Sequence, residues 1–163
     1  MDAQKVTLRK MTPAEYRAAA EHREEEAVRA LVRFMSEELA RERVRSGTAA
    51  FLPDGPDTAG HHLVTAHNGA GEAVGNAWIG PDPGQASGTD SSAWLYDLNV
   101  HEPYRRQGYG SAILAAAEEL VVSEGRTALA LDVVGSNEAA IALYRRSGYE
   151  VSSMSLRKGL GRR

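Results

Sequence analysis

Apolar and polar residues alternate most regularly over Trp94–Val100, where every second side chain is aromatic or aliphatic. A period of two is typical of a β-strand. Pro103 follows shortly and ends the strand, because proline has no N–H to offer a neighbouring strand. Farther on, apolar residues within Ile113–Val121 recur at the 3.6-residue period of a helix. The pattern therefore predicts a strand, a turn and an amphipathic helix that begins at Gly108.

Four further stretches have a strand-like pattern and are predicted to be strands: Lys5–Lys10, His61–Asn68, Ala73–Gly80 and Thr127–Val134. Between two of them, the sequence Asn68-Gly69-Ala70-Gly71 is typical of a hairpin turn. Gly47–Gly60 and Pro81–Ser92 are rich in turn-forming residues and are predicted to be loops. We therefore expect the two middle strands to pair as an antiparallel hairpin.

The N-terminal part of the chain is predicted to hold two helices. Thr12-Pro13 is a preferred helix start, with Thr as the cap and Glu15 at the capping-box position. Residues 14–45 are rich in Ala, Glu, Arg and Leu and contain neither Pro nor Gly. This stretch is too long for one ordinary globular helix, so a break is expected within it. Apolar residues within Val28–Leu39 form a stripe that we assign to the second helix.

The turn Arg105-Arg106-Gln107-Gly108-Tyr109-Gly110-Ser111 has the features of a phosphate-binding site. N–H groups at the start of a helix lack intrahelical partners, and the helix dipole makes that end partly positive. Gly108 and Gly110 let the backbone bend and approach a ligand, and two arginines add positive charge. No Lys follows as in a P-loop, and no third Gly follows as in a dinucleotide-binding fingerprint. From these residues alone, an ordinary strand–turn–helix with solvated arginines is the alternative.

Arg105-x-x-Gly108-x-Gly110, between a strand and an amphipathic helix, resembles the acyl-CoA pyrophosphate loop of the GNAT (general N-acetyltransferase) superfamily. The segment Asn137–Tyr149, with its Leu-Tyr and Gly-Tyr pairs, is similar to a second motif of that family. The resemblance covers residues 94–149 and extends beyond them only in the order of elements. It implies a single α/β domain over residues 1–163, with a mixed, mostly antiparallel sheet and helices on both faces. Acyl-CoA would lie in a split between two central strands.

The resemblance also implies which residues bind acetyl-CoA. The backbone of Leu98 and Val100 would pair with the pantetheine arm, and the Leu98 N–H would donate to the thioester oxygen. The turn would hold the pyrophosphate, which makes its binding set Arg105, Arg106, Gln107, Gly108, Tyr109, Gly110 and Ser111. Tyr144 matches the tyrosine that contacts the sulfur and protonates the departing thiolate, although spacing alone would make it a core residue of a helical stripe. Asn137 is either a helix N-cap or a pantetheine-binding side chain, and the two roles are compatible.

The general base that takes a proton from the amine is less clearly marked. Many relatives carry a carboxylate on the strand before the loop, and the only one here is Asp97. Alternation places Asp97 on the opposite face of the strand from Trp94 and Tyr96. Asp97 is a candidate base, and a structural Asp that anchors nearby backbone is the alternative. Glu37, Glu38 or a chain of waters could act instead.

Composition limits the possible chemistry. The chain of 163 residues has no Cys, which excludes disulfides and an acyl-cysteine intermediate, so direct attack by the amine in a ternary complex is the simpler proposal. Its five His lack metal-ligand spacing, and no metal is expected. The net charge of −3 argues against nucleic acid as a partner. Residues 1–100 hold 10 basic and 15 acidic side chains, whereas residues 101–163 hold 9 and 7, a balance that suits the phosphates of CoA.

No apolar run reaches membrane-spanning length, and the N-terminus lacks a signal pattern, so we expect a cytoplasmic protein with no membrane partner. The expected function is that of an acetyl-CoA-dependent N-acetyltransferase that acts on a primary amine of a small molecule or peptide. The alternatives are a non-catalytic acyl-CoA-binding or regulatory module with the same fold and, more remotely, a purely structural interaction domain. A homodimer is implied by the resemblance alone.

Overall fold

The computed structural model describes residues 4–84 and 91–161, and the chain separates into two compact units, residues 1–132 and 133–163. The first unit contains, in chain order, β1 (Thr7–Lys10), α1 (Pro13–Leu31), α2 (Glu37–Phe51), β2 (His62–His67), β3 (Ala73–Pro81), β4 (Ser92–Val100), α3 (Tyr109–Ser123) and β5 (Ala128–Ala130). Short 3-10 turns lie at Gly55–Asp57 and Glu102–Tyr104. The second unit contains α4 (Glu138–Arg146). Residues 85–90 of the predicted 81–92 loop lie outside the described part of the chain.

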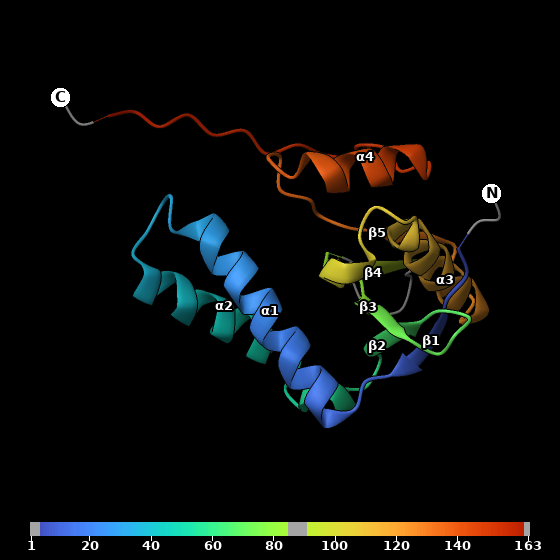
Figure 1. Ribbon diagram of the computed structural model, residues 1–163. Helices are drawn as coiled ribbons and strands as arrows, with labels where there is room; N and C mark the ends of the chain where they lie inside the picture. Colours follow the sequence, from blue (N-terminus) through green and yellow to red (C-terminus); the bar gives the residue numbers. More distant parts are fainter. Residues whose placement is uncertain (1–3, 85–90, 162–163) are drawn as a thin grey trace. The chain divides into compact units, whose positions relative to one another are not determined.

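The strands form one five-stranded sheet in the order β1-β2-β3-β4-β5 (Figure 1). Neighbours are antiparallel from β1 to β4, whereas β4 and β5 are parallel. The predicted mixed, mostly antiparallel sheet is therefore confirmed. The Asn68 side-chain oxygen closes the predicted hairpin by accepting hydrogen bonds from the N–H groups of Ala70 and Glu72, at 3.0 and 2.9 Å. Strand β5 is shorter than predicted and pairs only beside Ser92–Trp94.

The predicted start of α1 is confirmed by a complete capping box. The Thr12 hydroxyl accepts a hydrogen bond from the Glu15 N–H at 3.2 Å, and the Glu15 carboxylate accepts one from the Thr12 N–H at 2.8 Å. Two donors that a helix start would leave unpaired are thus satisfied by one pair of residues. Within the described residues, no helix has the length and apolar character needed to cross a membrane.

The expected break between the first two helices lies at residues 32–36, and Ser36 caps α2. The apolar stripe of residues 28–39 therefore spans the break and does not belong to the second helix alone. Helix α2 continues to Phe51, so the prediction of a loop from residue 47 was also wrong. Gly47 lies inside the helix because a single Gly lowers helix propensity by only about 1 kcal/mol.

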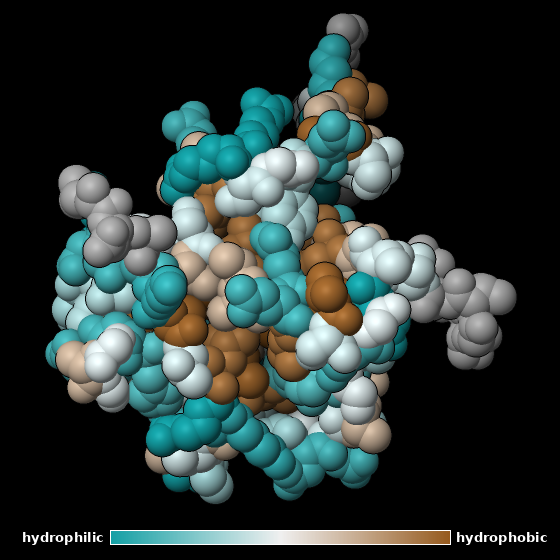
Figure 2. Space-filling model, turned by 90° about the vertical axis from the view of Figure 1, so that its right-hand side faces the viewer, coloured by the Kyte–Doolittle hydropathy of each residue, from teal (hydrophilic) through white to brown (hydrophobic). Residues whose placement is uncertain are grey.

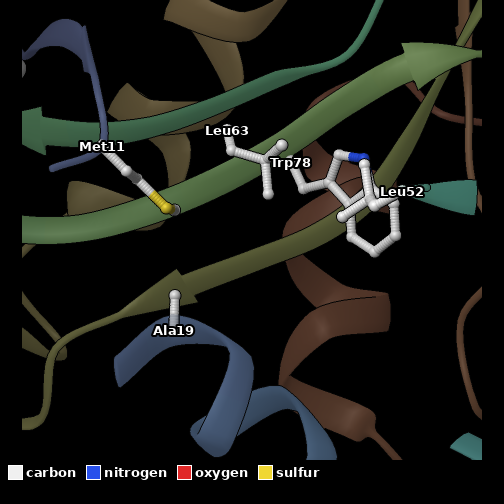
Figure 3. Packing of buried hydrophobic residues seen from close by; sticks show 5 residues of the cluster. All are labelled: Met11, Ala19, Leu52, Leu63 and Trp78. Atoms are coloured by element: carbon white, nitrogen blue, oxygen red, sulfur yellow. The ribbon is translucent and has the colours of Figure 1, made fainter. Parts of the chain in front are cut away.

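Helices α1 and α2 lie side by side and cover one face of the sheet (Figure 1). Ala19 of α1 and Leu52 at the end of α2 pack with Met11, Leu63 and Trp78, all of them buried (Figure 3). Burying apolar surface between helix and sheet is the main source of stability at such a contact.

Helix α3 covers the opposite face through Ile113, Leu114 and Ala117, which are fully buried. Gly75 of β3 is the point of closest approach. A Cβ atom at Gly75 would lie 2.4 Å from the Asn99 carbonyl oxygen and 2.7 Å from Ile113 Cδ1. Only a residue without a side chain fits there, and its presence lets α3 pack directly on the strand. The predicted helices on both faces of the sheet are confirmed.

Strand β4 contains a bulge that changes the facing of its side chains. In the pairing with β3, Asp97 is opposite Trp78. The next β3 residue, Ile79, is opposite Leu95, which leaves Tyr96 as an extra residue. Tyr96 stacks on Trp78, with ring centroids 4.5 Å apart, so Tyr96 and Asp97 both face α1. The prediction that alternation turns Asp97 away from Tyr96 was wrong, because the bulge interrupts the period of two.

A groove of about 680 Å³ runs between β1, β2 and α3. Its apolar lining includes Leu8, Val64 and Leu120, and Lys10 and Glu119 are among its polar residues. Figure 2 faces the side of the molecule where β1 and α3 lie, and it shows apolar residues gathered in a recess bordered by hydrophilic ones. None of the predicted site residues lines this groove.

In the second unit, Asn137 caps the start of α4, and its side-chain oxygen accepts the Ala140 N–H at 3.2 Å. The predicted N-cap is confirmed. Gly148 has φ +92°, and the Tyr149 N–H donates to the Tyr144 carbonyl at 3.0 Å. This left-handed stop satisfies carbonyls at the end of the helix that would otherwise be unpaired.

Candidate active site

In the part of the chain that the structure describes, the turn after β4 leaves N–H groups at the start of α3 without a hydrogen-bond partner. Gly108 and Arg106 have φ values of +85° and +61°, in the left-handed region. Among the described residues, Ala112 is the first in α3 whose N–H bonds back to a carbonyl, that of Gly108, at 3.2 Å. The N–H groups that precede it are available to an anion. Arg105 and Arg106 form no ion pair within the described residues, so their charge is not neutralised there.

The side chains of the turn mainly hold its shape. Arg105 Nε donates to the Val100 carbonyl at 2.9 Å, and Gln107 Nε2 donates to the Pro103 carbonyl at 3.1 Å. Tyr109 is buried, and its ring is edge-on to that of Tyr104, with ring centroids 6.0 Å apart. These contacts fix the backbone and leave its N–H groups to meet a ligand.

The outer edge of β4 carries the backbone groups that the sequence assigns to pantetheine. Strand β5 pairs only with the first residues of β4, so residues 95–100 have no strand partner on that side in the described part of the chain. The His101 N–H donates to the Val74 carbonyl at 2.9 Å, and in an antiparallel ladder such inward bonds recur at every second residue. Leu98 and Val100 therefore direct their N–H and C=O groups outward, to the open edge.

Asp97 is half-buried, and its carboxylate faces α1. Burial raises the pKa of Asp97. The positive charge of Arg23, the nearby His22 ring and a hydrogen bond from the Leu98 N–H partly offset that rise, whereas the charge of Glu26 adds to it. A carboxylate with a raised pKa is a better proton acceptor than an ordinary Asp. The pairing with Trp78 and the packing of α1 on the sheet thus give the only carboxylate of the strand both a facing and an environment that suit a base.

An aromatic platform lies beside Asp97, made of Trp78, Tyr96 and Phe51. Phe51 is edge-on to Tyr96, with ring centroids 5.2 Å apart. Trp78 Nε1 donates to His61 Nδ1 at 3.0 Å, which fixes the indole in its plane. The guanidinium carbon of Arg23 lies 4.7 Å from the centre of the Trp78 ring. Burial lowers the pKa of Arg23, and the Asp97 charge opposes that change.

A second, polar cleft of about 400 Å³ lies between α1 and the sheet and reaches the turn after β4. Its polar lining includes His22, Thr65, Asn76, Asn99, Glu102 and Arg105. Hydrogen-bonding groups of both kinds are present, as in pockets that orient a polar ligand. Within the described residues, no three potential metal ligands come together.

The structure brings Asp97, Leu98, Val100 and the turn of residues 105–111 together at one end of β4 in the first unit. Tyr144 and Asn137 belong to the second unit. Tyr144 is half-buried, with its ring edge-on to Tyr149 at 5.7 Å. The other candidate bases, Glu37 and Glu38, are exposed in the first turn of α2.

In this open sheet, the parallel strands β4 and β5 separate after a short stretch of pairing. The glycine turn and the start of α3 lie at the end of β4. This is the architecture of a coenzyme A-dependent acyltransferase. The model of the Acetyltransferase (GNAT) family matches residues 18–149. The chain belongs to the GNAT family and is an acetyl-CoA-dependent acyltransferase.

Individual relatives agree with this assignment. The uncharacterized N-acetyltransferase YycN of Bacillus subtilis (strain 168) is 29% identical over 149 residues, which cover 83% of this chain and 94% of YycN. The crystal structure of YycN matches with a TM-score of 0.88 at 27% identity, over 97% of this chain and 100% of that one. The PaiA N-acetyltransferase of Thermoplasma acidophilum, solved in complex with coenzyme A, matches with a TM-score of 0.65 over 93% of each chain. Its identity of 16% makes this a likeness of fold alone.

Sequence reasoning missed the residues of α1 that face Asp97. Arg23 and His22 lie in a highly charged helix, where nothing distinguishes them from solvated neighbours. Trp78 was assigned only to a strand. Their connection depends on the contact between α1 and the sheet, and no local pattern carries that information.

Proposed function

We propose that this protein transfers the acetyl group of acetyl-CoA to a primary amine of a small molecule or peptide, by direct attack within a ternary complex. The observation that best supports the proposal is the open edge of β4, which leads to the free N–H groups before α3. An extended pantetheine arm can add to such an edge through backbone hydrogen bonds, as a peptide does in β-augmentation.

In this proposal the turn of residues 105–111 holds the pyrophosphate through its N–H groups and the charges of Arg105 and Arg106. The remaining members, Gln107, Gly108, Tyr109, Gly110 and Ser111, contribute through their backbone. Leu98 and Val100 pair with pantetheine. Asn137 contacts pantetheine through the part of its side chain that the helix cap does not use.

The reaction forms a C–N bond and breaks a C–S bond. The amine nitrogen attacks the thioester carbonyl carbon, and the Leu98 N–H stabilises the developing negative charge on the oxygen. Asp97 accepts the proton that the amine loses. Tyr144 donates its phenolic proton to the departing thiolate, although a phenol has a pKa near 10 and a thiol a pKa of about 8.5, so close placement must favour the transfer.

The proposal is tested by measuring thiol release from acetyl-CoA against a panel of simple amines, amino acids, polyamines, aminoglycosides and short peptides. Release that depends on the amine, with intersecting initial-rate lines, is the expected result for a ternary complex. Parallel lines would contradict direct attack. Binding of acetyl-CoA without release for any amine would favour an acyl-CoA-binding module.

The role of Tyr144 is tested by Tyr144→Phe. The variant keeps the ring and loses the proton donor, so turnover is expected to fall about a hundredfold, in the range of general acid catalysis. Tyr149→Phe is the matched control, since its ring contacts Tyr144 and only its hydroxyl is removed. Equal activity of the two variants across the pH range would show that Tyr144 is not the acid.

A further inference from the structure

Arg23 occupies an unusual place for a residue of a highly charged helix. It is half-buried, and its guanidinium lies over the Trp78 ring, 4.7 Å from the centroid. Trp78 is 4% exposed and is held by the hydrogen bond from its Nε1 to His61 and by the stacked ring of Tyr96. A guanidinium over an indole gains cation–π attraction, and this contact fixes where its charge lies.

That charge lies beside Asp97, because Asp97 pairs with Trp78 across the β3–β4 ladder and directly paired residues lie on the same face of the sheet. The charged or titratable groups that act on Asp97 come from α1: Arg23 and His22, which favour the carboxylate, and Glu26, which disfavours it. From the sheet, the Leu98 N–H also favours the charged form.

Arg23 and Asp97 do not form a direct ion pair within 4 Å in the described part of the chain. A bidentate arginine would occupy both carboxylate oxygens and hold them away from a substrate. An arginine held on an indole stabilises the negative charge from a distance and leaves the oxygens free. This arrangement suits a carboxylate that must take up a proton.

We propose that Arg23 is a positioning residue: held on Trp78, it keeps the Asp97 carboxylate charged and facing α1, ready to accept the proton of the amine. The inference rests on the proposed role of Asp97 as base. It adds a residue that lies outside the acetyl-CoA loop and has no contact with the reacting atoms.

The first test measures the titration of Asp97 itself, by carbon-13 NMR of labelled aspartate carboxyls assigned with Asp97→Asn. In Arg23→Gln the Asp97 resonance should titrate at higher pH than in the wild type, because a favourable charge is lost. In Arg23→Lys the charge is kept, and the titration should stay near that of the wild type. Arg17→Gln, an exposed residue of the same helix, is the matched control and should change nothing. An unchanged Asp97 titration in folded Arg23→Gln would overturn the proposal.

The second test follows acetyl transfer against pH, with the panel amine that the wild type acetylates fastest. In Arg23→Gln, kcat/KM at neutral pH should fall about tenfold and recover as the pH rises, because the acid limb of the profile moves upward. A uniform loss at every pH would mean a merely structural role and would overturn the proposal. Where Arg23→Gln fails to fold, Arg23→Met removes the charge and keeps an apolar side chain against Trp78, and the same upward shift of the acid limb is expected.

The two tests separate this inference from the proposed function. Full turnover in Asp97→Asn would show that Asp97 is not the base, and Arg23 would then have no role in catalysis through Asp97. The NMR comparison does not depend on turnover, so it decides on its own whether Arg23 controls the charge of Asp97.

Discussion

At the scale of single residues, function and stability require different states of the Asp97 side chain: a base must be ionised, whereas the fold favours the protonated form. Burial raises its pKa in the folded protein above the unfolded value. Its contribution to stability is therefore fully present below the unfolded pKa and is lost as the pH rises through the folded pKa. The proposed base must be ionised, which is the state that the fold disfavours.

Asp97→Asn should remove this dependence on pH. As the pH rises from about 4, where model aspartates titrate, the wild type should lose stability relative to the variant. Melting temperatures of the two proteins between acidic and neutral pH measure the effect, and the difference in favour of the variant should grow. Asp54→Asn, at an exposed site, is the control. A constant or shrinking difference would mean that the pKa of Asp97 is not raised by folding.

Asp97 also shows what local sequence can and cannot predict at this scale. Its presence on the strand before the turn is visible in the sequence, but its facing is not. A bulge depends on how β3 and β4 pair, and the period of two in β4 contains no trace of it. The partners on α1 are likewise set by helix–sheet packing, which a period in one segment does not describe.

At the scale of elements, α3 has a left-handed glycine at each end, Gly108 with φ +85° and Gly125 with φ +81°. Gly108→Val and Gly125→Val should each lower the free energy of unfolding by about 1–2 kcal/mol, because a side chain disfavours that conformation. Only Gly108→Val should also weaken CoA binding, by about tenfold, since it distorts the proposed pyrophosphate seat. Urea unfolding and calorimetric titration with CoA measure the two effects. Equal CoA affinity in both variants would mean that the pyrophosphate of CoA does not bind at the turn around Gly108.

The packing of α3 on the sheet gives a second prediction at this scale. Gly75→Ala should destabilise the protein by about 1–3 kcal/mol, because the new methyl group collides with the Asn99 carbonyl and Ile113. Gly69→Ala, in the β2–β3 turn with no atom within 4 Å of the added Cβ, should be close to neutral. Chemical unfolding of both variants tests this, and similar stabilities would mean that α3 can move away from β3 at little cost.

Elements with strong periodicity were predicted well, and their ends less well. The strands of the hairpin, the strand before the turn and α3 lie where the pattern placed them. The break between α1 and α2 falls in an apolar stripe, so no change of pattern marks it. β5 ends at Ala130, short of the predicted residue 134, because its pairing with β4 stops at Trp94.

At the scale of the whole molecule, the uneven charge of the chain predicts salt-dependent binding. Acetyl-CoA at a hundred times its Kd should stabilise the protein by about 2.7 kcal/mol. The melting shift should shrink in high salt, because screening weakens attraction between the phosphates and the basic half of the chain. An acetyl thioester without phosphates, S-acetyl-N-acetylcysteamine, should show no such dependence. The comparison uses thermal melts at low and high salt, and a salt-independent shift with acetyl-CoA would argue against recognition through phosphates.

The fold as a whole could be predicted because one strand–turn–helix motif identified the family, and the family fixes the order of the remaining elements. The acceptor could not be predicted. The cleft of about 400 Å³ is lined by side chains from α1, β2, β3 and β4 together, so its shape and polarity depend on how distant segments pack. Such a meeting of distant segments leaves no mark in any single one of them.

The bulge in β4 can also be seen as a one-residue insertion. Leu95 pairs with Ile79, and Asp97 pairs with Trp78. Because Trp78 and Ile79 are neighbours in β3, removing Tyr96 would restore a regular ladder and leave all the remaining side chains on their present faces. An insertion of this kind adds a ring to the aromatic platform and repositions no neighbour. A lineage could gain or lose Tyr96 in a single indel, and aligned relatives that differ in length by one residue here would differ in that ring while sharing the carboxylate.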